Sequence, residues 1–280
     1  MKDINKTLLL ATAVVAAFIA GCKSQYDILL EGNDVDAKYA AAFDYFNQGK
    51  YSKSAQLFES LSALTKGSEK DDTVQYYWGL SNYRQHDFYT AETNFMSFVA
   101  NYPLSPFAEA ARFYRIDCLY RQTLRYELDQ TPTHTALAAI SEYISDYPES
   151  PYLDNCKEML DDLGDRIDRK AFENARLYYT MEDYRAARVA LKNVLKDNSD
   201  NRYREQILYY SAMASFKYAD LSVKEKQRER YLTFVDDYLN FIGEYPDSVY
   251  RKELDSHYRA VQKTLGGSGA IPGEASGNES

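Results

Sequence analysis

The side chains of this chain that could do chemistry are scattered, and their spacing matches no catalytic motif. Its three histidines, His86, His134 and His257, lie far apart, and the sequence contains no HExxH or CxxC pattern. The glycine-rich segment GGSGAIPGE lacks the Lys-Ser/Thr pair of a phosphate-binding loop. The many carboxylates fall on helix faces that we expect to be solvated. We therefore predict no enzymatic activity, no cofactor and no metal ion.

One cysteine, Cys22, does lie in a context typical of covalent modification. Lys2 and Lys6 form a basic start, and an apolar run from residue 8 to 20 follows it. The run ends in the string IAGC, which resembles the bacterial lipobox, in which the cysteine is acylated and becomes the new N-terminus. An ordinary signal peptide with an incidental cysteine, or a short membrane anchor, is the alternative, although the run is too short to span a bilayer comfortably.

We therefore predict a lipoprotein signal peptide over residues 1–21 and acyl chains such as palmitate on Cys22. Each buried CH₂ of such chains contributes about 0.8 kcal/mol to membrane binding. Lys23 follows the cysteine. By resemblance to lipoprotein sorting, an aspartate there would favour the inner membrane, so this sequence favours the outer membrane.

The other two cysteines, Cys118 and Cys156, could pair in an oxidising compartment or stay as small buried residues. If their helices stack in parallel, the two positions differ by about seven residues along the helix, or about 10 Å. A disulfide needs Cα atoms within about 7 Å. We therefore predict free thiols.

The stretch from Tyr76 to Pro103 shows the elements that must position any site. It is predicted to form two short helices joined by a turn at residues 86–87, with the small residues Gly79 and Ala91 facing each other. This layout resembles the tetratricopeptide repeat, a helix hairpin with a period of about 34 residues.

The same helix hairpin recurs along the chain, and a short sequence motif, which we call the phrase, recurs between hairpins. The phrase reads NYPLSPF at 101–107, DYPESPY at 146–152, EYPDSVY at 244–250 and, in degenerate form, DNSDNRY at 197–203. We expect Ser105 and Ser150 to cap the helices that follow them, with proline at the first helical position.

The predicted architecture is an all-α solenoid of about five tetratricopeptide-like hairpins with a C-terminal capping helix at about 249–265. One long helix, from Pro151 to about Met181, joins an N-terminal to a C-terminal group, and a charged link is expected at 224–230. The predicted domains are a lipidated tether (22–33), the solenoid (34–265, with N-terminal repeats 34–148 and C-terminal repeats 149–265) and a disordered tail (266–280).

The formal net charge of −9 disfavours nucleic acid as a partner. A lipobox, about five repeats in about 240 residues and the YPxS phrases together resemble the BamD family of outer-membrane lipoproteins. The resemblance implies a scaffold of the β-barrel assembly machine, lipid-anchored at the periplasmic face of the outer membrane. The implied partners are the BamA-like barrel subunit and unfolded outer-membrane β-barrel proteins, recognised by a C-terminal aromatic segment. The alternatives are an adaptor for pilus assembly or cell division, or a lipoprotein for nutrient uptake.

The expected functional surface is the side lined by the first helices of hairpins one and two. Aromatic side chains there would receive apolar side chains of a peptide, and an arginine or an asparagine would meet its backbone or terminal carboxylate. Packing between repeats is the alternative role for each of these residues. The predicted groove residues are Tyr39, Phe43, Phe46, Asn47, Tyr76, Leu80, Tyr83 and Arg84.

Overall fold

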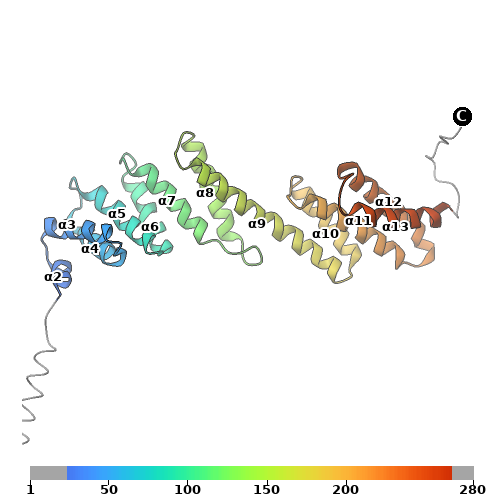
Figure 1. The fold of residues 1–280 in the computed structure, drawn as a ribbon, viewed down its shortest axis with the longest axis horizontal. Helices are drawn as coiled ribbons and strands as arrows, with labels where there is room; N and C mark the ends of the chain where they lie inside the picture. The colour runs from blue at the N-terminus through green and yellow to red at the C-terminus, as the bar shows by residue number, and fades with distance from the viewer. Residues whose placement is uncertain (1–23, 267–280) are drawn as a thin grey trace, which may run out of the picture. The chain divides into compact units, whose positions relative to one another are not determined.

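The computed structural model of the chain describes residues 24–266, within which the regular structure is twelve α-helices (Figure 1). The helices divide into two compact units, which we describe separately. The first holds residues 24–123 and 131–156, and the second holds residues 124–130 and 157–266. The boundary at Cys156 and Lys157 falls inside one continuous helix, α9 (Leu153–Thr180).

The first unit consists of a short helix followed by three antiparallel hairpins. Each helix packs against the next along the chain from α3 to α8. The helices are α2 (Gln25–Glu31), α3 (Val35–Asn47), α4 (Tyr51–Leu64), α5 (Asp71–Arg84), α6 (Phe88–Asn101), α7 (Ala108–Arg121) and α8 (Thr131–Asp146).

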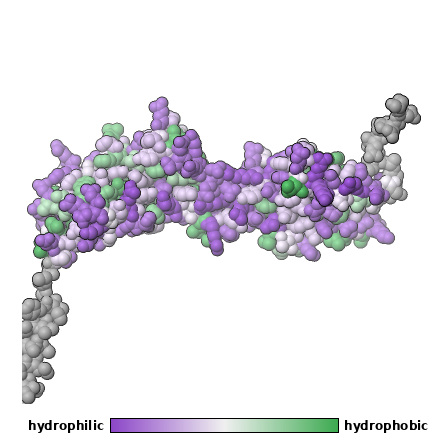
Figure 2. Space-filling model, in the orientation of Figure 1, coloured by the Kyte–Doolittle hydropathy of each residue, from purple (hydrophilic) through white to green (hydrophobic). Residues whose placement is uncertain are grey.

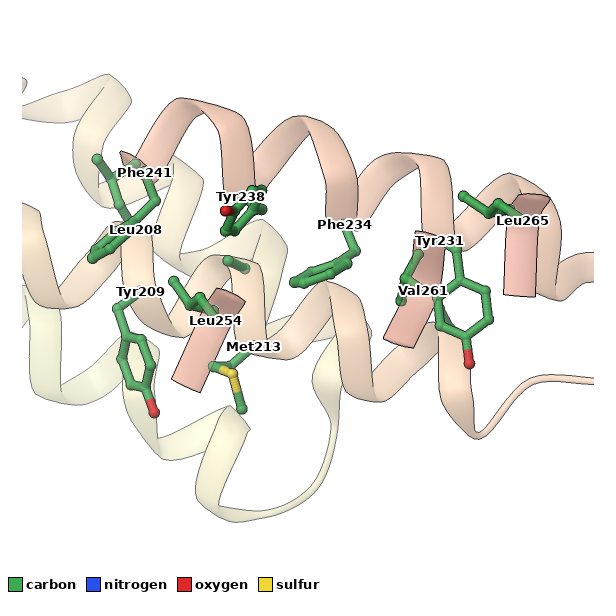
Figure 3. Packing of buried hydrophobic residues seen from close by; sticks show 12 residues of the cluster. Leu208, Tyr209, Met213, Tyr231, Phe234, Tyr238, Phe241, Leu254, Val261 and Leu265 are labelled. Carbon is green, nitrogen blue, oxygen red and sulfur yellow. The ribbon is translucent and has the colours of Figure 1, made fainter. Parts of the chain in front are cut away.

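The second unit contains the rest of α9 and four further helices, α10 (Tyr184–Asp197), α11 (Arg204–Asp220), α12 (Lys224–Glu244) and α13 (Arg251–Gly266). Its largest core lies between α11, α12 and α13. Leu254, Val261 and Leu265 of α13 lie among the aromatic side chains of α12 (Figure 3). The last helix therefore covers the end of the stack, as a capping helix does. The all-α, tetratricopeptide-like prediction of five hairpins and a cap is confirmed.

The repeated phrases form one recurring joint between hairpins. The side chains of Ser105, Ser150 and Ser248 each accept a hydrogen bond from the backbone N–H two residues later, at 3.3, 3.2 and 3.1 Å. Asn201 makes the same contact at 2.9 Å in the degenerate phrase. The expected capping role is wrong, because a further turn separates these residues from the helix. The N–H of Ala108, for example, donates to the Ser105 carbonyl, and α7 begins only at Ala108.

The aromatic residue that ends each phrase stacks on an aromatic ring of the preceding hairpin. Ring centroids are 4.5 Å apart for Phe107 on Tyr76 and 4.0 Å apart for Tyr152 on Phe113. Tyr203 stacks on Phe172 at 5.3 Å, and Tyr250 on Tyr209 at 4.2 Å. Four stacked pairs thus fix one hairpin on the next, and they explain why the phrase recurs.

Two segments differ from the sequence expectation. Residues 25–31, assigned to the tether, form α2, because Ser24 and Asp27 make a reciprocal capping box. Residues 224–230, expected as a charged link, form the first two turns of α12. They contain no apolar stripe, but Lys, Glu, Gln and Arg are all strong helix formers. Within residues 24–266, no helix combines the length and apolar character needed to cross a bilayer.

Candidate functional site

The eight predicted groove residues lie on α3 and α5, the first helices of hairpins one and two, but they are not equally accessible. Asn47 and Arg84 are exposed at the C-terminal ends of these helices. Tyr76 and Leu80 are each only 7% exposed. The other four, Tyr39, Phe43, Phe46 and Tyr83, are half-buried.

Tyr76 and Leu80 belong to the core between α5, α6 and α7. Besides stacking on Phe107, the Tyr76 ring lies 6.1 Å from that of Phe95 and 5.8 Å from that of Phe98. These two side chains pack between repeats, which is the alternative role that the sequence left open. They are therefore not available to a peptide.

The half-buried aromatics of α3 pack against rings of the core and stay partly accessible. Phe43 packs at 4.6 Å against Tyr77, and Phe46 packs at 5.3 Å against the same ring. Tyr39 lies 4.9 Å from Phe43, and the ammonium of Lys70 lies 4.9 Å above its ring. These rings therefore form the rim of the first hairpin.

Tyr83 is held in a polar network that the sequence did not predict. Its hydroxyl donates to the carboxylate of Asp117 on α7, and the guanidinium of Arg121 donates to the same carboxylate at 2.6 Å. Burial, and then the hydrogen bond to Asp117, raise the pKa of Tyr83 well above its ordinary value. Tyr83 thus joins hairpin two to hairpin three. The only signal in the sequence was the i,i+4 spacing of Asp117 and Arg121.

A second candidate site, also missed by sequence reasoning, lies in the second unit. A cavity of about 450 Å³ opens between α10, α11 and α12. Its lining is rich in cations, with Arg185 and Arg188 on α10 and Lys226 and Arg230 on α12. One carboxylate, Glu229, also lines the cavity, together with the exposed apolar side chain of Val189, the ring of Tyr218 and the hydroxyls of Ser215 and Thr233. The i,i+3 and i,i+4 spacing of these cations was the available signal.

Most of the cations of this cavity have no carboxylate partner. Arg188 pairs with Asp237 at 2.6 Å. The Arg230 guanidinium lies 4.0 Å over the Tyr218 ring, and neither it, Arg185 nor Lys226 forms an ion pair within the described part of the chain. The cavity can therefore attract an anion, although the whole chain carries a net charge of −9.

The matching cavity of the first unit, between α6, α7 and α8, is neutralised internally. There Arg112 pairs with Asp146 at 3.0 Å, and Arg115 pairs with Glu92 at 2.9 Å. Of these two cavities, only that of the second unit is lined by cations without a carboxylate partner in the described part of the chain. The face of the molecule in Figure 2 is otherwise mostly hydrophilic, with apolar side chains in separate small patches.

The described residues, 24–266, were also predicted to hold no metal ion and no disulfide. No group of three or more His, Cys, Asp or Glu side chains is arranged to hold a metal ion there. Cys118 and Cys156 are buried free thiols, as the helix offset predicted. Burial raises the pKa of Cys118 to about 12 and that of Cys156 to about 11, so both are poor nucleophiles. Cys22 lies outside the described residues.

Comparison with known proteins identifies the family. Residues 32–230 match the family described as YfiO, outer membrane lipoprotein. The chain belongs to this family. Over 203 residues it is also 23% identical to the outer membrane protein assembly factor BamD of Caulobacter vibrioides, covering 71% of this chain and 67% of that protein. The predicted membership of the BamD family is therefore confirmed.

Among solved structures, a tetratricopeptide repeat protein from Parabacteroides merdae is similar at 12% identity. The match covers 84% of this chain and 75% of that one, with a TM-score of 0.34. The outer membrane lipoprotein family and the hairpin fold together favour a scaffold over an enzyme.

Proposed function

We propose that this protein is a lipid-anchored scaffold at the periplasmic face of the outer membrane, where it assists the assembly of β-barrel proteins. The observation that carries the proposal is the family match over residues 32–230, supported by the similarity to an outer membrane protein assembly factor. Its proposed partners are the BamA-like barrel subunit and unfolded outer-membrane proteins. Hairpins that pack side by side offer long surfaces for such partners.

The proposed anchor is an acylated Cys22, preceded by a signal peptide over residues 1–21. Without the thiol no acyl chain can be attached, so Cys22→Ala should leave a protein that does not reach the outer membrane. Fractionation of membranes and metabolic labelling with palmitate measure this. Recovery of the variant in the outer membrane, still labelled, would contradict the anchor.

The proposed peptide surface is the accessible part of the predicted groove, formed by Tyr39, Phe46, Asn47 and Arg84. Arg84 is exposed and has no carboxylate partner within residues 24–266, so it can pair with the terminal carboxylate of a peptide. The half-buried rings of Tyr39 and Phe46 are proposed to contact an aromatic side chain of the peptide.

A double-mutant cycle tests this surface. Peptides that end in an aromatic residue, with a free or an amidated C-terminus, are titrated against the wild type and Arg84→Ala. Amidation should weaken binding to the wild type about tenfold, which is 1.4 kcal/mol, and should hardly affect binding to Arg84→Ala. Gln48→Ala, at an exposed site one residue beyond α3, is the matched control. If amidation weakens binding equally for the wild type and Arg84→Ala, the terminal carboxylate of the peptide does not pair with Arg84.

The proposed site for the barrel subunit is the basic cavity of the second unit, whose unpaired cations suit a carboxylate-bearing surface. Arg185→Glu with Arg230→Glu should reduce co-purification of the barrel subunit from solubilised membranes, whereas Lys196→Glu, on α10 but not in the cavity lining, should not. Unchanged co-purification in the double variant would exclude the cavity. Pilus or septal components in place of a barrel subunit would instead favour another envelope adaptor.

A further inference from the structure

The short helix α2 is attached to the first hairpin at its N-terminal end. The hydroxyl of Tyr26 donates to Gln56 at 2.7 Å and to the carbonyl of Lys53 at 3.2 Å, both on α4. The Tyr26 ring meets that of Tyr45 edge to face at 5.5 Å. The start of α2 therefore lies beside the turn that joins α3 to α4.

The other end of α2 is attached by a buried lysine. The ammonium of Lys38, a residue only 1% exposed, donates to the carbonyl of Leu30 at 3.0 Å and to the hydroxyl of Ser60 at 2.6 Å. No ion pair of Lys38 is found in the described part of the chain, so the lysine serves these two neutral acceptors. With both ends held, α2 is fixed in one direction along the hairpin.

The start of α2, just after the proposed acylation site, therefore lies at a defined edge of the first hairpin. Cys22 precedes Ser24, the N-cap of α2, by two residues, and two residues span at most about 7 Å. A lipid attached to Cys22 would therefore bring the bilayer surface close to the α3–α4 turn. A flexible tether of twelve residues would impose no such orientation.

The side chains at this edge suit a membrane surface. Lys50 and Lys53 are exposed and form no ion pair within residues 24–266. Their ammonium groups lie over tyrosine rings, 5.7 Å from that of Tyr45 for Lys50 and 4.9 Å from that of Tyr26 for Lys53. Tyrosine with a polar tip and lysine with a long apolar stem are typical of membrane interfaces. Such lysines are attracted to anionic headgroups.

We propose that Tyr26, Tyr45, Lys50 and Lys53 form a membrane-contacting patch that binds the phosphate groups of phospholipid headgroups. The edge of the first hairpin that carries the α3–α4 turn thus faces the bilayer. This inference rests on the proposed acylation of Cys22, which brings the patch to the membrane. Asn47 and the turn after it lie at the same edge, so a peptide bound there is held near the membrane surface.

The test is a proximity measurement on the full-length acylated protein in vesicles of phosphatidylethanolamine and phosphatidylglycerol. A fluorophore is attached to Ser52→Cys, at the start of α4, or to Ser68→Cys, beyond its other end. Both sites are exposed, and the buried thiols Cys118 and Cys156 should stay unlabelled. The length of α4, about 21 Å, separates the two probes. Lipids with a nitroxide on the headgroup should quench the probe at residue 52 several-fold more than the probe at 68.

Charge reversal tests the lysines themselves. Lys50→Glu with Lys53→Glu should abolish the difference between the two probes, whereas Lys66→Glu with Lys196→Glu, which changes the net charge equally, should preserve it. In 1 M salt, where the Debye length is about 3 Å, the wild type should approach the reversed variant. If the protein floats with the vesicles but both probes are quenched equally, the membrane-contacting patch is wrong and the acylation of Cys22 stands. Protein that does not float with the vesicles would overturn the acylation, and the inference with it.

Discussion

Asp237 shows how single residues hold the second unit together. Its side chain on α12 is only 9% exposed and accepts hydrogen bonds from Arg188 at 2.6 Å, from Lys192 at 2.9 Å and from the hydroxyl of Ser215. Burial alone would raise the pKa of this carboxyl, but the hydrogen bonds from Arg188, Ser215 and Lys192 hold it below its ordinary value. One carboxylate thus connects three helices.

We expect Asp237→Asn to destabilise the protein by about 2 kcal/mol at neutral pH. Breaking a fully buried ion pair costs about 3–5 kcal/mol, and the partial exposure of Arg188 and Lys192 reduces this cost. Because the folded-state pKa is lowered, the contribution is complete above about pH 4, the unfolded value, and is lost as the pH falls through the folded value. Urea unfolding at neutral and acidic pH measures it.

The exposed neighbour Asp236 provides the control for this prediction, since Asp236→Asn removes the same charge from the surface of α12. A difference between the wild type and Asp237→Asn that persists unchanged below pH 3 would show that the carboxylate is not what stabilises the contact.

At the scale of elements, the tight turns of three hairpins share one position with a left-handed backbone conformation. Gly49, His86 and Glu182 all have positive φ, at 73°, 67° and 62°. Only glycine adopts this left-handed conformation without steric cost. The aspartates that follow, Asp87 and Asp183, cap α6 and α10 and hold the turns closed.

Glycine at the two strained positions should therefore stabilise the hairpins. We expect His86→Gly and Glu182→Gly each to raise the free energy of unfolding by about 1 kcal/mol, because the strain of a left-handed non-glycine residue is of this order. Gln85→Gly, at a neighbouring residue with φ of −86°, should instead lower it. Thermal denaturation shows whether each change raises or lowers stability. Destabilisation by all three changes would mean that the turns are not strained.

The close contact of α5 and α6 gives a second prediction for an element. A Cβ added to Gly79 would lie 3.0 Å from the Phe95 ring and 3.3 Å from Cβ of Asn94. Gly79 thus lies against Phe95 and Asn94 of α6, and Ala91 on the same helix is fully buried. Gly79→Leu should overpack the contact and lower stability by about 1–3 kcal/mol or more.

Ala100→Leu, at an exposed position of α6, is the matched control for Gly79→Leu and should change the melting temperature little. Glu92 of α6 is not a neutral control position, because its carboxylate pairs with Arg115 at 2.9 Å. Equal losses for Gly79→Leu and Ala100→Leu would mean that the packing of the hairpin is different.

The sequence predicted the long, periodic elements well and the faces of those elements less well. A helix that packs on both its hairpin partner and the next repeat carries apolar residues on two sides, so periodicity could not separate Tyr76 in the core from Phe46 at the rim. Helix α2 was missed because seven residues carry little periodic signal, although Ser24 and Asp27 have the spacing of a capping box. The basic cavity was missed because its cations come from two helices far apart in the chain.

At the scale of the whole molecule, each unit has its own core, and tyrosine is a major component of both. Burial is the main cause that raises the pKa to about 12 for Tyr102 in the first unit and for Tyr179 and Tyr238 in the second. For Tyr238 the hydrogen bond that it donates to Asp255 at 2.7 Å adds to this effect. In the unfolded chain the same hydroxyls ionise near pH 10.

These shifts predict that both units lose stability in alkali. A folded-state pKa above the unfolded value contributes stability that is complete below about pH 10 and is lost as the pH rises to about 12. The buried thiols act in the same direction, whereas Lys38, whose pKa burial lowers, acts in the opposite one. Because several tyrosines oppose one lysine, the melting temperature should be level around neutral pH and fall steeply above pH 10.

Circular dichroism and tyrosinate absorbance, followed together, should change in the same pH range. Ionisation of all the tyrosines near pH 10 with the helices intact would place these rings outside the core.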